Sequence, residues 1–410
     1  MLNAYDKQGG AAIATYRLHR GLLATGLNSQ MLVQSKKSDD PNVLVPFMRW
    51  KRAIADFRLK LDTFPLSRYK NRQKVSFSAA WLSERLAQKI AALGPDIVHL
   101  FWLGDAFFKI ETLKALRQPI VWTLHDMWPF TGGCHYDNEC GRFQQSCGRC
   151  PILHSDRDND LSRQVWHRKR KSWDAVPITV VATSKWLADR ARSSSLFRDL
   201  RVEVIPNGID TDKYKPLDKQ AARAAYNLPQ DKFLILFSAF GPTSDKRKGG
   251  HYLARALEIL AQSGRSSDIE LVILGVNRPS GAPEFGMTVH YMGCLHDEIS
   301  QVLLYSAADV LAAPSMQENL SNTVMESLAC GTPVVSFNIG GMPDMIDHQE
   351  NGYLATPFEP DDFARGLAWV IEDRVRYNAL SQQARSRAVE RYKLETVANR
   401  YLALYQSILK

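Results

Sequence analysis

The chain has 410 residues, 45% of them hydrophobic and 23% charged, which is ordinary for a soluble globular protein of two or three domains. It holds no run of about 18 apolar residues that would predict a transmembrane helix, and its first residues lack the apolar core of a signal peptide, so we expect a cytoplasmic protein. The net charge of +9 leaves three classes of partner open: nucleic acid, anionic lipid and phosphorylated small molecules.

Short apolar runs alternate with helical segments along most of the chain. The runs are rich in β-branched residues and span residues 97–100, 120–124, 178–182, 202–205, 234–237, 271–274, 310–313 and 334–337. Such runs are typical of buried parallel strands, and the alternation of strands with helices predicts doubly wound sheets. The length favours two sheets over one. Before the turn at Gly9-Gly10, the first strand has room for only about five residues.

A turn signal at Pro206-Asn207-Gly208 separates the two predicted sheets. We therefore predict an N-terminal domain of residues 1–206 and a C-terminal domain of residues 207–385, both Rossmann-like. Residues 386–410 carry an apolar pattern of helical period, and we expect this helix to pack back on the N-terminal domain.

Positive charge is concentrated in two stretches. Residues 49–74 hold nine Lys or Arg against Asp56 and Asp62, with aromatic residues interleaved, and residues 168–171 are all basic. Two interpretations stay open: solvated helix faces, or adhesion to an anionic membrane surface through basic residues and interfacial aromatics. Nucleic acid is a weaker third alternative, because no nucleic-acid-binding signature accompanies the charge.

Four of the six cysteines fall within one short stretch, at Cys134, Cys140, Cys147 and Cys150. The last pair has the Cys-x2-Cys spacing that is common in metal sites, whereas the first two gaps are not standard zinc spacings. One interpretation is a structural zinc, with His135 and His154 as further candidate ligands, and the other is a set of packed or surface thiols. Stable disulfides are not expected in a reducing cytoplasm.

The strongest chemical signal is the segment from Glu318 to Glu326, which follows a predicted strand and a loop at Ser315. Open α/β sheets bind ligands at the carboxyl ends of their strands, and Glu318 lies in such a loop. Ser321 is a good N-cap for the next helix, whose free N–H groups would face an anion such as a diphosphate. Glu326, a turn or more inside the helix, could accept hydrogen bonds from a pair of ribose hydroxyls.

With these motifs the chain resembles the retaining glycosyltransferases of family 4, also called group 1, whose hallmark is this Glu-x7-Glu pattern. The resemblance covers nearly the whole chain. Further matching motifs are Val204 to Asp210 at the domain junction, Arg247-Lys248-Gly249-Gly250, Ile339 to Asp344, and Asn351-Gly352-Tyr353. His125-Asp126 and Thr131-Gly132-Gly133-Cys134 match the branch of the family that makes bacterial surface polysaccharides.

The resemblance implies the GT-B fold, an α/β architecture in which two Rossmann-like, doubly wound domains face each other across a cleft. It implies a saccharide or lipid-linked acceptor at the N-terminal domain and a UDP- or GDP-sugar at the C-terminal domain. It assigns catalysis to His125, Glu318 and Lys248, and donor binding to Gly10, Arg247, Lys248, Asn319, Leu320, Ser321 and Glu326. The implied reaction retains the anomeric configuration and needs no catalytic metal. Many members have a Gly-Arg pair before the lysine, where this chain has Thr243, and Arg247 is the expected replacement.

Rival functions stay open at the level of sequence. An epimerase of the same fold would release an altered nucleotide-sugar without an acceptor, and the Glu-x7-Glu pattern argues against it. A zinc-stabilised nucleic-acid-binding protein would account for the cysteines and the net charge. An oxidoreductase is weaker still, because no Gly-x-Gly-x-x-Gly motif follows a strand.

Overall fold

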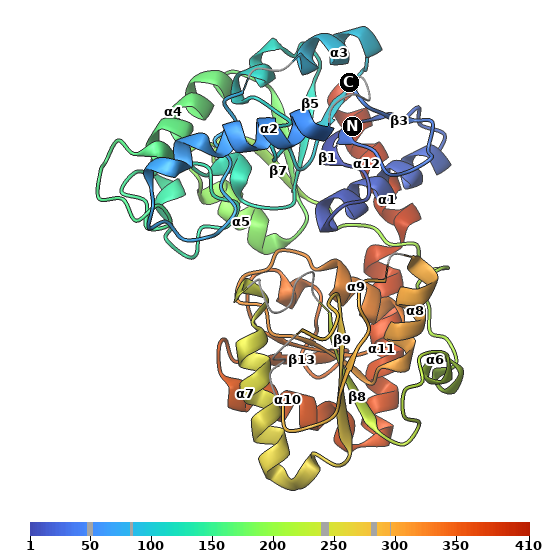
Figure 1. Ribbon diagram of the computed structural model, residues 1–410. Coiled ribbons are helices and arrows are strands. Elements are labelled where there is room, and N and C mark those ends of the chain that lie inside the picture. Colours follow the sequence, from blue (N-terminus) through green and yellow to red (C-terminus); the bar gives the residue numbers. More distant parts are fainter. Residues whose placement is uncertain (47–51, 83–84, 239–245, 280–284, 296) are drawn as a thin grey trace. The chain divides into compact units, whose positions relative to one another are not determined.

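The computed structural model describes residues 1–46, 52–82, 85–238, 246–279, 285–295 and 297–410 (Figure 1). The chain divides into two compact units. Met1–Asn207 and Val397–Lys410 form the first unit, and Gly208–Thr396 form the second. Residues 49–51 of the first basic stretch, and Thr243, lie outside the described residues.

The first unit is built on a seven-stranded parallel sheet with the strand order β3-β2-β1-β4-β5-β6-β7. Its strands are β1 (Leu2–Tyr5), β2 (Met31–Ser35), β3 (Val43–Leu44), β4 (Val98–Leu100), β5 (Ile120–Leu124), β6 (Ile178–Ala182) and β7 (Arg201–Val204). Its helices are α1 (Gly10–Ala24), α2 (Arg52–Thr63), α3 (Leu86–Leu93), α4 (Leu161–Trp173) and α5 (Lys185–Ser193), with the 3₁₀ helices η1 (Phe64–Arg68) and η2 (Ile110–Ala115) among the connections.

The core of the first unit lies on both faces of this sheet. All five residues of β5 are buried, which is why its sequence is continuously apolar or small rather than alternating. Trp122 of β5 is completely buried, packs edge-on against Trp173 with ring centroids 5.1 Å apart, and donates from Nε1 to Phe101 O at 3.1 Å. Central strands of this kind make the unit a rigid platform for the loops at its edge.

The short first strand is a central one. β1 pairs with β2 on one side and β4 on the other, and Ala4 is completely buried. The chain order reverses between β1 and β4, which makes this point the place where open sheets bind ligands. Gly9 precedes α1 with φ 86° and ψ 162°, a conformation that favours glycine.

The second unit is a six-stranded parallel sheet with the order β10-β9-β8-β11-β12-β13. Its strands are β8 (Phe233–Ser238), β9 (Ile269–Leu274), β10 (Val289–Tyr291), β11 (Val310–Ala313), β12 (Val334–Phe337) and β13 (Gly352–Ala355). Its helices are α6 (Lys219–Ala225), α7 (Gly250–Leu260), α8 (Glu298–Ala307), α9 (Asn322–Ala329), α10 (Pro360–Glu372) and α11 (Arg374–Tyr392). The predicted fold class, two Rossmann-like parallel α/β domains, is confirmed.

The C-terminal segment departs from the expected boundary at residue 386. Arg385 donates to the carbonyl oxygens of Thr211 and Ala329, and these bonds keep α11 with the second unit as far as its end. Only α12 (Leu394–Leu409) returns, and from Val397 it belongs to the first unit. Residues 386–396 therefore stay with the second unit. None of the described helices is both long and apolar enough to cross a membrane.

Candidate functional site

The loop after β11 brings Glu318 against two cations of η5 (Lys246–Lys248). Lys248 Nζ donates to Glu318 Oε2 at 2.5 Å, and Arg247 Nη1 lies 3.5 Å from the same oxygen. Glu318 is only 7% exposed. Burial raises the pKa of this carboxyl, but the charges of Lys248 and Arg247 lower it more strongly, to about 2. An ionised carboxylate and two cations therefore meet where the second sheet reverses its strand order, between β8 and β11.

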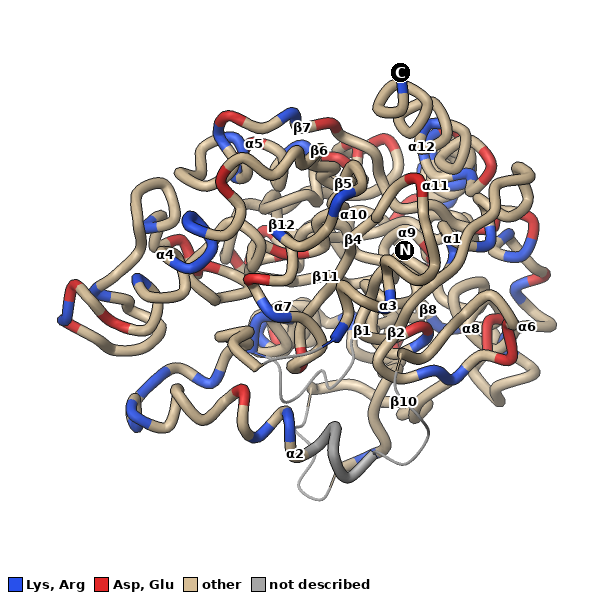
Figure 2. Tube along the Cα trace, turned by 90° about the horizontal axis from the view of Figure 1, so that it is seen from above, with Lys and Arg blue, Asp and Glu red and all other residues tan. Residues whose placement is uncertain are grey.

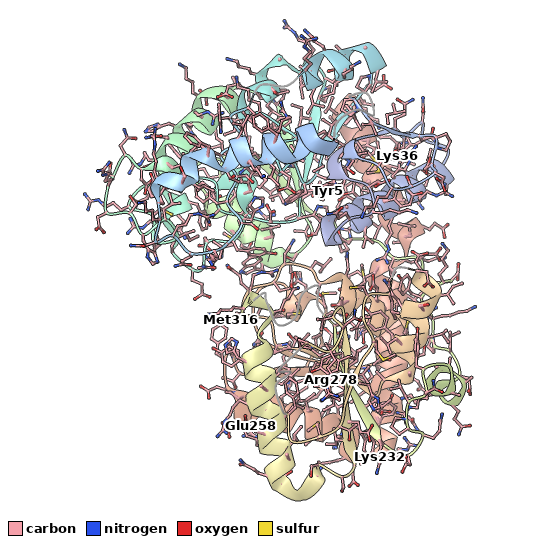
Figure 3. All side chains as sticks on the ribbon, viewed as in Figure 1. Tyr5, Lys36, Lys232, Glu258, Arg278 and Met316 are labelled. Carbon is pink, nitrogen blue, oxygen red and sulfur yellow. The ribbon has the colours of Figure 1, made fainter. Side chains whose placement is uncertain are left out.

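Two glycines permit this close approach of loops. A Cβ at Gly249 (φ 71°) would lie 1.8 Å from a carbonyl oxygen in the loop after β11, and one at Gly340 (φ 54°) would lie 2.0 Å from Glu318 O. The amide of Met316 donates to Arg247 O at 2.8 Å, and Figure 3 shows Met316 beside the start of α7. The glycines in both sequence motifs are thus required by backbone contacts that place the carboxylate against the cations.

The residues between the two acids lead into α9. Asn319 and Leu320 are buried, and Ser321 occupies the N-cap position with extended backbone angles. The Ser321 side chain makes no capping bond to the helix, because its Oγ pairs with Thr323 Oγ1 at 2.9 Å. The expected N-cap position is confirmed, whereas the side-chain bond differs from the usual one.

Glu326 lies inside α9 and is 5% exposed. Tyr305 of α8 donates its hydroxyl to Glu326 Oε2 at 2.9 Å. Burial, and then the neighbouring carboxylate, raise the pKa of Tyr305 well above its usual value, so the phenol stays a donor at neutral pH. This bond fixes the orientation of the second acid. Sequence reasoning missed Tyr305, because it has no motif of its own within the apolar pattern of α8.

The remaining predicted site residues belong to the first unit. Gly10 is the first residue of α1, directly after the positive-φ Gly9. His125 follows β5; its Nε2 lies 3.3 Å from Asn207 Oδ1, and its ring stacks on Phe101 with centroids 6.0 Å apart. Burial lowers the pKa of His125 to about 4, so its imidazole is neutral at physiological pH.

Asp126 anchors a hydrogen-bonded chain that the sequence did not reveal. Its Oδ2 accepts from His135 Nδ1 at 2.6 Å and from Trp102 Nε1 at 2.8 Å. The other ring nitrogen of His135 lies 2.9 Å from Ser78 Oγ. Burial raises the pKa of Asp126, but the charge and the hydrogen bond of His135 bring it below its usual value. The sequence alone suggests His135 only as a further candidate metal ligand, because no spacing rule connects it with Asp126.

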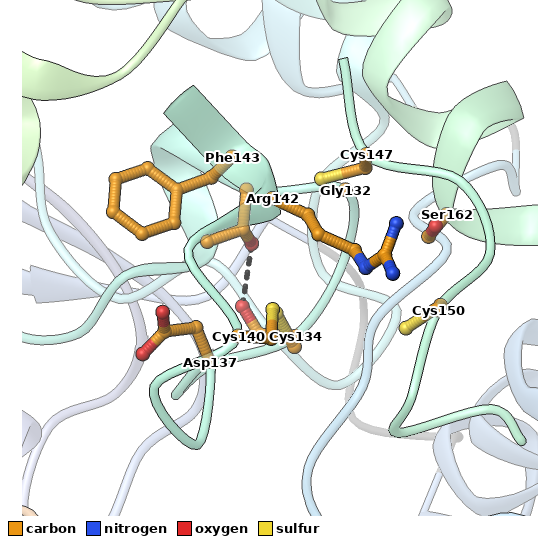
Figure 4. Close-up of a pocket in the computed structure, with 10 residues that line it drawn as sticks. Gly132, Cys134, Asp137, Cys140, Arg142, Phe143, Cys147, Cys150 and Ser162 are labelled. Atoms are coloured by element: carbon orange, nitrogen blue, oxygen red, sulfur yellow. Dashed lines mark hydrogen bonds between the residues drawn. The ribbon is translucent and has the colours of Figure 1, made fainter. Parts of the chain in front are cut away.

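The four clustered cysteines line one small cavity of about 10 Å³, roughly the room of one water molecule (Figure 4). Burial raises the pKa of all four thiols, that of Cys147 to about 12. All four are free thiols, and nowhere in the described ranges are three or more His, Cys, Asp or Glu arranged to hold a metal ion. The four cysteines therefore lie together, as the zinc interpretation requires, but in the described residues they are not arranged as metal ligands.

Two Rossmann-like units, one with a carboxylate and two cations at the switch point of its sheet, fit the architecture of the GT-B class of glycosyltransferases. Sequence comparison supports a closer assignment. Residues 218–387 match the family described as glycosyl transferases group 1, and residues 8–213 match glycosyltransferase family 4. The chain therefore belongs to the group 1/family 4 glycosyltransferases.

Individual relatives are distant. A D-inositol 3-phosphate glycosyltransferase of Saccharomonospora viridis is 30% identical over 224 residues, which are 51% of this chain and 50% of that protein. The chain thus spans about half the length of that relative. Sucrose-phosphate synthase of Thermosynechococcus elongatus has a TM-score of 0.67 at 19% identity, over 98% of this chain and 94% of that chain. Anabaena HepE in complex with UDP has a TM-score of 0.63 at 19% identity, over 99% and 98%. At these identities the structural likeness concerns the fold.

Proposed function

We propose that the protein transfers a sugar from a UDP- or GDP-sugar to a hydroxyl of a saccharide or lipid-linked acceptor, with retention at the anomeric carbon. The product would be part of a bacterial surface polysaccharide. The observation that carries the proposal is the buried Glu318 carboxylate, paired with Lys248 and Arg247. This cluster offers cations to a diphosphate and a carboxylate to sugar hydroxyls within one site.

In the proposed reaction the acceptor attacks on the face from which the nucleotide leaves. Catalysis then consists mainly of stabilising negative charge on the departing diphosphate. Lys248 and Arg247 supply this stabilisation, together with the amides of residues 319–321. Glu318 holds hydroxyls of the sugar, and Glu326 holds the ribose. Because no metal is required, activity should survive EDTA; a loss that magnesium or manganese restores, without unfolding, would contradict this.

The family resemblance assigns Gly10 and His125 of the first unit to the donor phosphate and the transferred sugar. Gly10 opens α1 at the switch point of the first sheet, where a backbone without a side chain lets a phosphate come close. The pKa of His125 is lowered to about 4 by burial. A neutral imidazole would bind the hydroxyls of the transferred sugar through hydrogen bonds, without contributing a charge.

We further propose a cytoplasmic enzyme that attaches peripherally to the inner face of the membrane. Support comes from the basic residues of α2 and of the segment after it, which are prominent along the tube in Figure 2. The UDP bound to HepE of Anabaena makes uridine nucleotides the first donors to test.

A structural zinc in the cysteine-lined loop stays a prediction. Metal analysis of the purified protein decides between a structural zinc, at about one zinc per chain, and packed thiols. Cys147→Ser should lose it, whereas Cys294→Ser, a change at a cysteine outside the cluster, should keep it. Zinc well below one per chain, even after reconstitution, would leave the cysteines as ordinary thiols.

A thermal-shift screen with UDP, GDP, ADP and their sugars tests the proposed function. One nucleotide and its sugar should raise the melting temperature, because a ligand that binds only the folded state stabilises it. The same ligand should have little effect on Glu326→Ala. If none of these nucleotides shifts the wild-type protein, the proposed donor site is wrong.

A further inference from the structure

The first unit carries a surface groove that the proposed donor site does not use. The groove has a volume of about 420 Å³ and runs between η1, the loop at Trp81 and the start of α4. Ala79, Leu161 and Val165 are its buried apolar lining, whereas the lining residues Phe64 and Trp81 are exposed. Its volume lies in the range of small-molecule sites.

Hydrogen bonds hold the sides of this groove in place. Trp81 donates from its amide to Asp62 Oδ1 at 3.3 Å and from Nε1 to Asp62 O at 3.4 Å. Across the groove, the amide of Leu161 donates to the hydroxyl of Tyr69 at 2.9 Å. These contacts tie the end of α2, η1 and α4 together, so the groove is formed in advance of any ligand.

Two charged side chains of the groove, Arg168 and Glu111, already pair with each other within the protein. Arg168 donates to both oxygens of Glu111, at 2.8 and 2.9 Å, and to the carbonyl oxygens of Ala79 and Ala80, each at 2.9 Å. Lys109 Nζ lies 3.8 Å from Glu111. A saccharide needs many hydrogen-bond partners, and these side chains have few to spare. The groove therefore offers a saccharide little beyond its apolar and aromatic side chains.

Exposed aromatic side chains gather around the groove. Among the described residues, the exposed Phe and Trp side chains are Phe57 at 60%, Phe64 at 63% and Trp81 at 39%. Two of the three line the groove, and Phe57 belongs to the helix that leads to it. Exposed apolar surface gathered in one place marks a binding surface.

The charge of the groove is positive. Its lining contains Arg68, Lys109 and Arg168 against the single acid Glu111, a net charge of +2. Because Glu111 pairs mainly with Arg168, the excess charge belongs to Arg68 and Lys109. The groove therefore combines an apolar lining with cations, the complement of an anionic amphiphile.

We propose that this groove binds a phosphate joined directly to an apolar chain, the lipid-phosphate part of a lipid-linked acceptor. The phosphate lies against Arg68 and Lys109, and the chain lies along Phe64, Trp81 and Val165. That this ligand is an acceptor substrate rests on the proposed function. It does not depend on the donor site of the second unit.

Calorimetric titration of the full-length protein with farnesyl phosphate, below its micelle concentration, tests the proposal. We expect saturable binding of about one molecule per chain, and at least tenfold weaker binding of farnesol or inorganic phosphate alone. Arg68→Glu and Trp81→Ala should each weaken binding at least tenfold. Gln164→Trp, a change at an exposed lining position of α4, should block the groove without disturbing the core.

Two control variants make the corresponding kinds of change outside the groove, one from an aromatic residue to alanine and one from a basic residue to glutamate. Phe57→Ala and Lys70→Glu should bind farnesyl phosphate within about twofold of wild type, since neither residue lines the groove. Nucleoside diphosphate binding, measured in the same samples, reports on the donor site separately. If farnesyl phosphate binds but no nucleotide does, the proposed function fails and the groove assignment stands.

Three results would overturn the groove assignment. One is the absence of saturable farnesyl phosphate binding, and another is equal binding by wild type and Arg68→Glu. The third is displacement of the probe by a soluble oligosaccharide, which would make the groove a saccharide site. If the protein pellets with anionic vesicles but does not bind the soluble probe, only surface adhesion is present and the groove proposal is wrong.

Discussion

Replacing Glu318 by glutamine should have opposite effects on binding and on turnover. Glu318 Oε2 accepts from Lys248 Nζ at 2.5 Å and lies 3.5 Å from Arg247 Nη1. A nucleoside diphosphate that binds these cations must compete with the carboxylate for them. Glutamine keeps the size of the side chain but removes its charge, so the competition weakens. Turnover should fall, because the charged partner for the sugar hydroxyls is lost.

The expected size of the effect follows from the contacts. A hydrogen bond to a charged group contributes about 1.5–3 kcal/mol, and the diphosphate recovers only part of that. A gain of ~1 kcal/mol corresponds to roughly a fivefold tighter dissociation constant, since ~1.4 kcal/mol is tenfold. The pKa of Glu318 is lowered to about 2 from its usual value near 4.5. The carboxylate is therefore fully ionised at any pH above about 4.5 and loses its charge only as the pH falls toward 2. The difference between variant and wild type should therefore be constant from pH 5 to 8.

Calorimetric titration with UDP and GDP, together with initial rates of sugar transfer, measures both effects. Glu326→Gln is the matched control: it removes the same charge from the same motif, but Glu326 pairs with Tyr305 rather than with the cations. It should weaken nucleotide binding. If Glu318→Gln binds the nucleotide no more tightly than wild type, the competition inferred from the geometry does not exist.

Three further predictions concern the remaining charged groups. Lys248→Ala should lower turnover more than Lys248→Arg, because the role is positive charge on the leaving diphosphate; equal rates for Lys248→Ala and wild type would remove Lys248 from the mechanism. His135→Gln should raise the pKa of Asp126, because His135 lowers it in the wild-type protein. If activity needs the Asp126 carboxylate, the acid limb of the pH–rate profile should move to higher pH. An unchanged profile would mean that the His135–Asp126 pair is purely structural. The protein should pellet with anionic vesicles at low salt and dissociate from them at high salt, because each basic residue near the surface contributes about 1 kcal/mol. Vesicle binding should be abolished, and donor binding kept, when five basic residues are neutralised: Arg49, Lys51, Arg52, Arg58 and Lys60. If the wild-type protein does not bind such vesicles, the basic stretch is only a solvated face.

Most of the inner strands could be predicted from sequence, whereas three of the four edge strands could not. The runs at residues 120–124, 178–182, 310–313 and 334–337 coincide with β5, β6, β11 and β12, because strands covered on both faces are apolar throughout. β2, β3, β10 and β13 were missed, whereas the edge strand β7 lies within one residue of the predicted run 202–205. β3, β10 and β13 lie at sheet edges and are only two to four residues long.

The residues of the candidate site also fall into those that the sequence could identify and those that it could not. Glu318 and Lys248 could be found because a strand, a loop and a glycine motif surround each of them in sequence. Their contact, at 2.5 Å, joins residues 70 positions apart and needed the sheet topology to become visible. The bond of Tyr305 to Glu326 and that of His135 to Asp126 are of the same kind, since no local pattern encodes them. The groove of the first unit likewise combines segments from η1, the Trp81 loop, η2 and α4.

The central claim, sugar transfer from a nucleotide-sugar with retention, is tested most directly by following the anomeric protons of the donor by NMR. Wild-type protein and an excess of the donor selected by thermal shift should release the nucleoside diphosphate, slowly to water or faster with an acceptor. The first sugar product should have the anomeric configuration of the donor. The double variant Glu318→Gln/Glu326→Gln should release almost none. A first product of inverted configuration, or equal release by wild type and the double variant, would contradict the account.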